Sequence, residues 1–522
     1  MEPVILRPGV GDNRPTATLY YGQDTRETLR TLPEASVHTV CTSPPYFGLR
    51  SYFPDGLRLR ADLTPEQRAY VMAELELLGI KPIDVTCARC AINSHTQIGT
   101  SPVNTYHKDQ IPPHLMEFFQ PAEIGLESTP EEFVAALVEV FREVKRVLRP
   151  DGTLWVNLGD SYAGYWGDSK AREEGRASSA DTNGWTNGFN MNARPSFDHL
   201  RRSGLKPKDL IGIPWRVAFA LQADGWYLRQ DIIWAKPNPM PEAVTDRCTK
   251  SHEYVFLFAH PDSGGKYFYD AEAVKEPVSP VSIQRNKYAW NSQQRTRDPR
   301  EKRGSHFAEP GGMFPGDVRN KRSVWAVTVT PYKGAHFATW PPELVRPMVR
   351  AGTSAHGCCS GCGAPWVGHT GKSCPACNAT VPSRAMSCPT CGHVTDWKAG
   401  RLPPEDVASM AYGATDFSGS GKAVPRKASL APNPTTVFQG WVPSCKCVGT
   451  SRIPATVLDP FSGSATTGMV ALQEGQNYVG CDLNPDYLPL AMNRVQELSA
   501  PGPSSDKDDA EEGDAFDLFS DG

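Results

Sequence analysis

Hydrophobic and polar positions along the chain follow two periods, one typical of buried strands and the other of amphipathic helices. The clearest helix is expected at 130–148, where apolar side chains share one face and Thr129 can cap the first turn. Another is expected at 213–223, with Pro214 in the first turn, where its missing N–H group costs no hydrogen bond. Strands are expected at 37–41, 153–158, 227–234, 254–259, 323–329, 457–459 and 478–482, and further helices at 466–474 and 486–498. This alternation predicts an α/β fold with a mostly parallel sheet.

Long stretches without such a pattern separate the predicted core segments. We expect core segments at 1–52, 127–163, 209–274, 321–355 and 451–499, insertions at 53–126, 164–208, 275–320 and 356–450, and a tail at 500–522. The 45 glycines and 47 prolines of the 522-residue chain fit such loop-rich insertions. No run of 18 apolar residues is present, so we expect no membrane span, and the start of the chain lacks the apolar stretch of a signal peptide. The expected location is therefore the cytoplasm.

Charge is distributed unevenly along the chain, whose formal net charge is −4. Residues 506–522 carry eight carboxylates and one lysine, so the remainder has a small positive excess. The segment 284–303 has seven basic and two acidic side chains and contains Tyr288 and Trp290, which suits contact with phosphates and bases. A solvated surface loop would have the same charge. The acidic tail is expected to be disordered and solubilising, with 515–519 (AFDLF) as an alternative docking peptide for a replication sliding clamp.

The 14 cysteines are not expected to form a disulfide framework, because a cytoplasmic chain does not favour one, and the four unpaired ones, Cys41, Cys248, Cys358 and Cys481, are expected to be buried or incidental. Ten of them form five close pairs, and each such pair can present two thiolates to a zinc ion from one tight turn. The pairs expected to hold one or two structural Zn²⁺ ions are Cys374 with Cys377, Cys388 with Cys391, Cys359 with Cys362, and Cys445 with Cys447. The first two have zinc-ribbon spacing, and the last two bracket them and could close a second site. Cys87 and Cys90 have no second pair nearby, although His95 or His107 could complete a site.

The segment 459–468 (DPFSGSATTG) joins a predicted strand to a predicted helix. Its small residues let the backbone approach a ligand closely, and the N–H groups at a helix start favour a carboxylate or phosphate. One strand later comes Asp482, whose carboxylate could accept both hydrogen bonds from a ribose diol. This arrangement is typical of sites for nucleoside cofactors. By itself it leaves NAD, FAD and S-adenosylmethionine (AdoMet) open.

A second loop, 43–46 (SPPY), follows the predicted strand near the opposite end of the chain. Its two prolines stiffen the loop and fix its carbonyl groups. The Ser43 hydroxyl and the Pro44 carbonyl could both accept from an exocyclic amino group, which would turn the nitrogen lone pair out of ring conjugation. Tyr46 offers a flat surface for an extruded base. The candidate catalytic residues are therefore Ser43, Pro44, Pro45 and Tyr46.

In combination, these loops resemble the amino-methylating DNA methyltransferases of the permuted β class, in particular phage and prophage modification methylases. In that family a (D/S)PP(Y/F) motif precedes the AdoMet-binding FxGxG motif. Segments that match in order are 42–52 (TSPPYFGLRSY), 154–162 (LWVNLGDSY), 231–241 (DIIWAKPNPMP), 252–259 (HEYVFLFA) and 332–344 (YKGAHFATWPPEL). The resemblance spans most of 17–497. It implies a class I AdoMet-dependent methyltransferase: a Rossmann-like, circularly permuted, seven-stranded and mostly parallel sheet, here with inserted zinc-ribbon and loop-rich elements.

The resemblance also implies AdoMet as the cofactor, double-stranded DNA as the partner and the cytoplasm of a bacterial host as the location. The implied AdoMet contacts are Asp459, Phe461, Gly463 and Ser464 at the methionine end, Asp482 at the ribose, Asp24 near the adenine, and His336, Phe337 and Thr339 over the methionine moiety. Asp24 could instead cap a helix at 25–31, and His336 could be a packed or capping histidine. Ala465 departs from the family, which usually has glycine; if φ is positive there, alanine costs about 1 kcal/mol.

The expected reaction is a direct transfer to an exocyclic nitrogen, because no cysteine of this chain directly follows a proline in such a loop, as carbon-5 cytosine methylation requires. Serine rather than aspartate at position 43 favours cytosine N4, and adenine N6 stays the alternative. Candidate DNA contacts are Trp185, Asn187, Phe189 and Asn190 in 164–208, and the basic segment 284–303. Protection of a phage genome from host restriction is the implied role. Two other classes stay open: a non-catalytic zinc-ribbon DNA-binding protein, which would not require both loops, and an RNA or protein methyltransferase.

Overall fold

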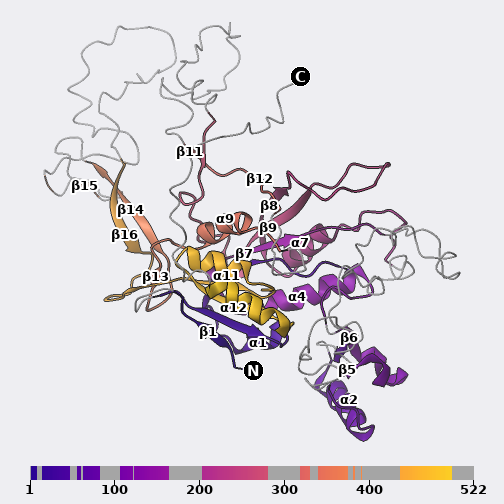
Figure 1. Ribbon diagram of the computed structural model, residues 1–522. Coiled ribbons are helices and arrows are strands. Elements are labelled where there is room, and N and C mark those ends of the chain that lie inside the picture. Colours follow the sequence, from indigo (N-terminus) through magenta and orange to yellow (C-terminus); the bar gives the residue numbers. More distant parts are fainter. Residues whose placement is uncertain are drawn as a thin grey trace, which may run out of the picture. The chain divides into compact units, whose positions relative to one another are not determined.

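The computed structural model describes residues 2–8, 14–47, 56–59, 63–82, 106–121, 123–163, 203–279, 318–329, 339–373, 380–381, 390 and 436–496 (Figure 1). The chain divides into two units, one of Met1–Ala355 with Pro454–Gly522 and the other of His356–Ile453. Several predictions fall outside the described residues: the DNA-contact candidates Trp185, Asn187, Phe189, Asn190 and 284–303, the pair Cys87 and Cys90, and the tail with its clamp-docking peptide. Among the described helices, none combines the length and apolarity that crossing a membrane requires.

The first unit is built on a nine-stranded sheet of order β1-β2-β19-β18-β3-β7-β9-β8-β12. The bounds are β1 Val4–Leu6, β2 Ala17–Tyr21, β3 Val37–Thr42, β7 Leu148–Leu158, β8 Tyr227–Ala235, β9 His252–Ala259, β12 Val324–Ala326, β18 Thr456–Asp459 and β19 Asn477–Asp482. In the seven strands from β2 to β8, β9 runs antiparallel to both neighbours and the other pairs are parallel. This is the class I methyltransferase arrangement that the sequence implied, extended by the short edge strands β1 and β12.

The strand order also explains the permutation. The last two strands of the chain, β18 and β19, lie between β3 and β2, which come from its start. Figure 1 shows segments from the two ends of the sequence together at the sheet edge as well, where the yellow helix α12 lies beside the indigo strand β1. Segments from the two ends of the sequence therefore share the middle of one sheet.

Helices cover both faces of the sheet. One layer contains α1 Thr25–Thr31, α4 Pro130–Val147 and α7 Ile213–Ala223, and the other contains α9 Pro342–Gly352, α11 Thr466–Gln473 and α12 Leu488–Gln496. Strand side chains alternate between the layers: Val40 packs in the first and the adjacent Cys41 in the second. The expected cap of α4 is present, because the Thr129 hydroxyl accepts from the Glu132 N–H at 3.2 Å and the Glu132 side chain accepts from the Thr129 N–H.

Two core elements, β2 and α9, were not expected from the sequence. Pro347 lies inside α9, where a proline removes one backbone hydrogen bond, and no helix was expected at these residues. The apolar face of α9 is nevertheless buried against the sheet. The other differences are at boundaries: β7 begins at Leu148, directly after α4, and β12 is shorter than the expected 323–329.

Smaller elements occupy parts of the expected insertions. Those of the first unit are β4 Gly56–Leu59, β5 Tyr106–His107, β6 Phe119–Pro121 and α2 Pro65–Leu77, with β10 Glu276–Pro277 paired to β11 Val318–Arg319. The antiparallel sheet of β4, β5 and β6 and the helix α2 contribute to a separate hydrophobic cluster that includes Leu57, Val71 and Tyr106. The second unit contains β13 Cys358–Cys359, β14 Trp366–Ser373, β15 Thr380–Val381, β16 Thr436–Pro443 and β17 Arg452–Ile453.

Candidate active site

The carboxyl ends of the parallel strands β19, β18, β3 and β7 meet at one edge of the sheet, where ligands of open α/β sheets bind. Because β9 is antiparallel, its first residues reach the same edge. A cavity of about 300 Å³ lies there. It is lined by the loop 43–46, which follows β3, and by residues 460–464, which follow β18. The two loops singled out from opposite ends of the sequence therefore face one cavity.

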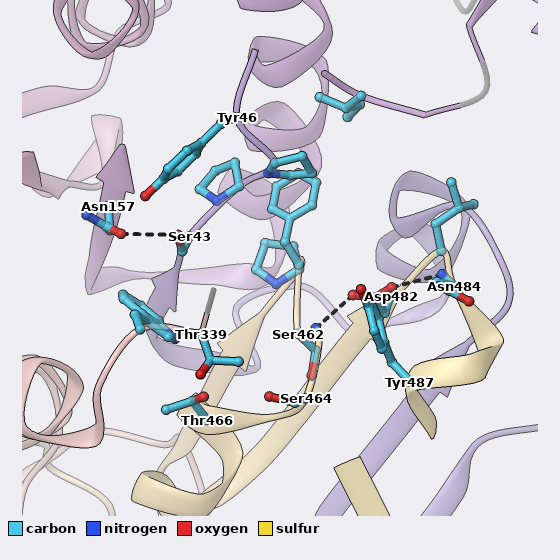
Figure 2. A pocket seen from close by; sticks show the side chains of 18 of the residues that line it. Ser43, Tyr46, Asn157, Thr339, Ser462, Ser464, Thr466, Asp482, Asn484 and Tyr487 are labelled. Atoms are coloured by element: carbon cyan, nitrogen blue, oxygen red, sulfur yellow. Dashed lines mark hydrogen bonds between the residues drawn. The ribbon is translucent and has the colours of Figure 1, made fainter. Parts of the chain in front are cut away.

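Most of the expected site residues line this cavity. They are Asp24, Ser43, Pro44, Pro45, Tyr46, Thr339, Phe461, Gly463, Ser464 and Asp482. Figure 2 shows Ser43 and Tyr46 in one part of the view and Ser464 and Asp482 in another, with Thr339 between these groups. His336 and Phe337 lie outside the described residues. The roles of all these residues toward a ligand stay predictions.

Asp459 has a different position from the one expected of a ligand contact. Its side chain is buried, and one carboxylate oxygen accepts from the Thr42 hydroxyl at 2.7 Å and from the Phe461 N–H at 3.1 Å. The other oxygen accepts from the Thr467 hydroxyl at 2.7 Å. Burial raises the pKa of Asp459 to about 6, although these hydrogen bonds favour the charged form. Asp459 therefore joins the end of β3 to the loop after β18 through these hydrogen bonds.

The loop after β18 is fixed to the end of β19. The Ser462 N–H donates to the Cys481 carbonyl at 2.8 Å, and the Gly463 N–H donates to one carboxylate oxygen of Asp482 at 2.7 Å. The Asn484 N–H donates to the other oxygen at 2.8 Å (Figure 2). Burial raises the pKa of Asp482 to about 6 against the effect of these two donors. The Asp482 carboxylate is thus held at the cavity by the backbone.

Ala465 has the positive φ at which an alanine is expected to be strained. Its φ of 58° and ψ of 42° are left-handed, and it occupies the position before the first turn of α11. The residue is fully buried, and its N–H donates to the Ser462 carbonyl at 2.8 Å in a tight turn. The backbone strain of about 1 kcal/mol expected of an alanine here therefore applies.

Asn157, near the end of β7, fixes the hydrogen-bonding state of Ser43. The Asn157 side-chain nitrogen donates to the Glu253 carboxylate at 3.2 Å and to the Tyr254 carbonyl at 3.1 Å. Both partners can only accept, so the amide oxygen of Asn157 must face Ser43. Ser43 Oγ donates to that oxygen at 3.1 Å. The lone pairs of the Ser43 hydroxyl are consequently left to accept from another group.

Glu253, near the start of β9, is a buried carboxylate that accepts hydrogen bonds from several side chains, one of them in the loop 43–46. The Tyr46 hydroxyl donates to it at 2.6 Å, and Lys236 Nζ lies 2.5 Å from its other oxygen. Lys236 Nζ also lies 4.4 Å from the centre of the Trp234 ring. Sequence reasoning did not select Asn157, Lys236 or Glu253 as site residues. Their position could have pointed to them, because each lies at or next to a strand end on the sheet edge that carries the cavity.

Asp24 has the helix-capping position considered for it, and its role toward a ligand stays a prediction. It lines the cavity and is also the N-cap of α1, accepting from the Arg26 N–H at 2.8 Å. The Arg26 guanidinium donates to both carboxylate oxygens, and Arg58 Nη1 lies 3.4 Å away. Burial opposes ionisation, but the hydrogen bonds and charge of Arg26, with the charge of Arg58, outweigh it and lower the pKa of Asp24 to about 2. The carboxylate is therefore charged at neutral pH.

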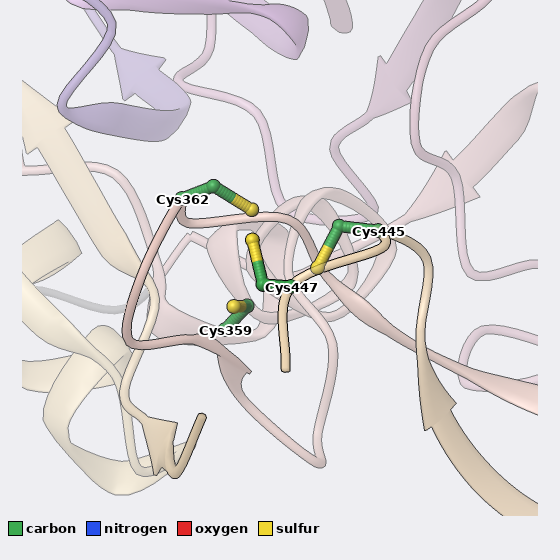
Figure 3. Close-up of side chains that lie close together, drawn as sticks. All are labelled: Cys359, Cys362, Cys445 and Cys447. Atoms are coloured by element: carbon green, nitrogen blue, oxygen red, sulfur yellow. The ribbon is translucent and has the colours of Figure 1, made fainter. Parts of the chain in front are cut away.

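In the second unit, the structure brings together two of the predicted cysteine pairs, Cys359 with Cys362 and Cys445 with Cys447 (Figure 3). The zinc-ribbon pairs Cys374 with Cys377 and Cys388 with Cys391 lie outside the described residues. Zinc binding by either set stays a prediction.

Residues 37–359 and 450–493 match the family model of the N6/N4 DNA methylases, described as DNA methylase. The chain belongs to this family. It is therefore a site-specific DNA methyltransferase of the amino-methylating type, as the two loops predicted. The phage or prophage character of the resemblance stays a prediction.

Two curated relatives are similar over nearly their whole length. The type II methyltransferase M.XycI of Xanthomonas campestris pv. cyanopsidis is 31% identical over 495 residues, which are 95% of this chain and 90% of that protein. M.Cfr9I of Citrobacter freundii is also 31% identical, over 92% of this chain and 88% of that protein. Among solved structures, a DNA modification methylase of Thermus thermophilus, TTHA0409, complexed with S-adenosyl-L-methionine, is 15% identical with a TM-score of 0.34, covering 93% of this chain and 96% of that one.

We predict that Glu253→Gln slows DNA methylation by roughly 10- to 100-fold, because a lost buried hydrogen bond to a charged group is worth about 1.5–3 kcal/mol. The amide must turn an N–H group toward Lys236 or toward the Tyr46 and Asn157 donors. Affinity for the methyl donor should change little, since Glu253 accepts from Tyr46 and Asn157, beside the loop 43–46, and not from residues 460–464. Single-turnover methylation and donor-binding calorimetry separate the two effects.

The matched control is Glu242→Gln, which alters an ion pair with Arg247 at 2.6 Å away from the cavity lining. This variant should leave the methylation rate and the affinity for the methyl donor unchanged. Equal methylation rates in the two variants would show that Glu253 does not position the catalytic loop.

Proposed function

We propose that this protein transfers a methyl group from AdoMet to the N4 amino group of cytosine in a specific sequence of double-stranded DNA. Adenine N6 is the alternative acceptor. Family membership shows methylation of an amino group of a DNA base. AdoMet as the methyl donor and cytosine as the base are the parts that we propose. The observation that carries the proposal is the single cavity lined by the loop 43–46 and by residues 460–464.

The residues on one side of the cavity fit a nucleoside donor. The Asp482 carboxylate uses one lone pair on each oxygen for backbone N–H groups, so both oxygens can accept further hydrogen bonds from a ribose diol. Gly463, at φ 51°, has no atom within 4 Å of where a side chain would begin, so a ligand can approach its backbone. Phe461 and Tyr487 add aromatic walls. When bound, AdoMet supplies a methyl group on a positively charged sulfur, and the carbon–sulfur bond breaks as the carbon–nitrogen bond forms.

On the other side, the loop 43–46 fits an amino group with two hydrogens. The Ser43 hydroxyl donates its hydrogen bond to Asn157, so its lone pairs can accept from the amine, and the Pro44 carbonyl is a second acceptor. Holding both N–H bonds turns the nitrogen lone pair away from the ring. Tyr46, anchored through its hydroxyl to Glu253, presents its ring for stacking. Rate acceleration then comes from positioning in a preorganised polar site, and the surplus proton leaves to solvent, directly or by way of the Ser43 hydroxyl.

Serine at position 43 is the feature that favours cytosine N4 over adenine N6. The surroundings are built for a hydroxyl, because the Asn157 amide oxygen faces residue 43 and would repel a carboxylate there. Both bases offer an amino donor beside a ring nitrogen, so the same loop could hold either.

Expression in a host that lacks N4-methylcytosine, followed by long-read sequencing of its genome and nucleoside mass spectrometry, tests this proposal. We expect N4-methylcytosine at one recognition sequence, and none with Ser43→Ala. N6-methyladenine in its place would overturn the choice of base. A genome without modified bases, from cells that contain the folded protein, would overturn the proposed function.

Affinity for AdoMet should weaken as the pH falls through about 6, the pKa to which burial raises Asp482. The ribose hydroxyls would donate to the ionised carboxylate, so protonation competes with binding and binding lowers the pKa. The expected loss approaches tenfold per pH unit below that pKa. Calorimetry from about pH 5 to about pH 8 measures it, over the range in which such a carboxyl titrates.

The variant Asp482→Asn supplies the control for this pH dependence. It should bind AdoMet more weakly at neutral pH and should lose the dependence that sets in below the Asp482 pKa. If the dependence persists in Asp482→Asn, another buried group such as Asp459, whose pKa is also about 6, is responsible. That result would contradict the ribose role of Asp482.

A further inference from the structure

Four cysteine sulfurs gather in the second unit, apart from the methylation chemistry. The Sγ atoms of Cys359, Cys362, Cys445 and Cys447 all lie within 4.8 Å of one another (Figure 3). Zinc binds thiolates at about 2.3 Å, which places the four sulfurs of a tetrahedron about 3.8 Å apart. The widest pair of the cluster therefore needs to close by only about 1 Å to hold one ion.

The turn that carries the first cysteine pair has the form of a metal-binding knuckle. The Gly361 N–H donates to Cys359 Sγ at 3.4 Å, as in a tight turn around a ligand sulfur. The chain then reverses at Gly363, whose φ of 71° favours glycine and whose N–H donates to the Cys359 carbonyl at 2.8 Å. This turn directs the Cys359 and Cys362 side chains to the same side as the Cys445 and Cys447 pair.

Backbone pairing around the cluster joins the two ends of the segment His356–Ile453. Strand β13, which contains Cys359, pairs antiparallel with β17 at the end of the segment. The Ser360 N–H donates to the Ser451 carbonyl at 3.1 Å, and the Ser444 N–H donates to the Pro365 carbonyl at 3.0 Å. One cysteine pair therefore comes from each end, and their junction already has a fixed register.

We propose that Cys359, Cys362, Cys445 and Cys447 together bind one Zn²⁺ ion that fastens the two ends of this segment. Four soft thiolates within 4.8 Å of one another suit zinc, and four such ligands leave no open coordination position, so the ion is structural. The pairs Cys374 with Cys377 and Cys388 with Cys391 are not needed to complete this site. An ion that links distant parts of a chain stabilises the folded segment by lowering the entropy of the open chain.

Metal analysis of the full-length protein tests the proposal. We expect the double variant Cys359→Ser/Cys447→Ser to contain one zinc ion per chain fewer than the wild-type protein. The difference isolates this site even if the other cysteine pairs bind a second ion. Cys248→Ser is the matched control, because Cys248 is exposed and lies in the other unit, and its zinc content should equal the wild type. Equal zinc in the double variant and the wild type overturns the proposal.

A second measurement uses the wild-type protein, so it does not depend on whether the double variant folds. Alkylation followed by peptide mass spectrometry should find the four cysteines protected until a zinc chelator is added, and Cys248 reactive throughout. Cys362 and Cys447 are exposed, so protection of their sulfurs would come from the metal rather than from burial. Alkylation of the four at the rate of Cys248 before chelation, or a disulfide bond between any two of them, overturns the proposal.

Discussion

The hydrogen bonds of the buried Asp459 carboxylate connect the two loops on which the site depends. Thr42 ends β3 directly before the loop 43–46, whereas Thr467 belongs to the first turn of α11, after the loop 460–464. Thr42 and Asp459 are 417 positions apart in the sequence. A buried carboxylate is costly unless donors satisfy it, and here three donors do so. The same hydrogen bonds that satisfy the charge therefore set the position of the loop 43–46 relative to the loop 460–464.

The sheet supplies the second constraint, since its strand directions decide which side chains reach the cavity. The antiparallel course of β9 brings Glu253 to the edge where the parallel strands end. Glu253 orients the Asn157 amide, and the Asn157 amide oxygen in turn accepts the hydrogen bond that the Ser43 hydroxyl donates. This series of directed hydrogen bonds leaves the lone pairs of the Ser43 hydroxyl to accept, as the role that we propose for Ser43 requires. The zinc site that we propose lies in the other unit and has no part in this series.

The sequence predicted the parts of the fold and site that depend on local pattern. Helix α4 follows from its apolar period and the Thr129 cap, and α7 from its pattern with Pro214 in the first turn. The loop 43–46 follows from its own chemistry. The strained Ala465 followed from one expected glycine position. Helix α9, which contains Pro347, was not expected. It forms because burial of its apolar face outweighs the one backbone hydrogen bond that the proline removes. Glu253 was not predicted as a site residue, since its role arises from strand direction and register rather than from its neighbours in sequence.

The methylation rate of Thr42→Val, compared with that of Thr42→Ser, tests most directly whether the Asp459 contact sets the site. Valine nearly keeps the shape of threonine but removes the donor to Asp459, while serine keeps the hydroxyl. We predict that the valine variant is slower by about tenfold or more, because a hydrogen bond to a buried charge is worth about 1.5–3 kcal/mol. The serine variant should remain close to the wild type. Wild-type rates in the valine variant would contradict this account of how the two loops are held together.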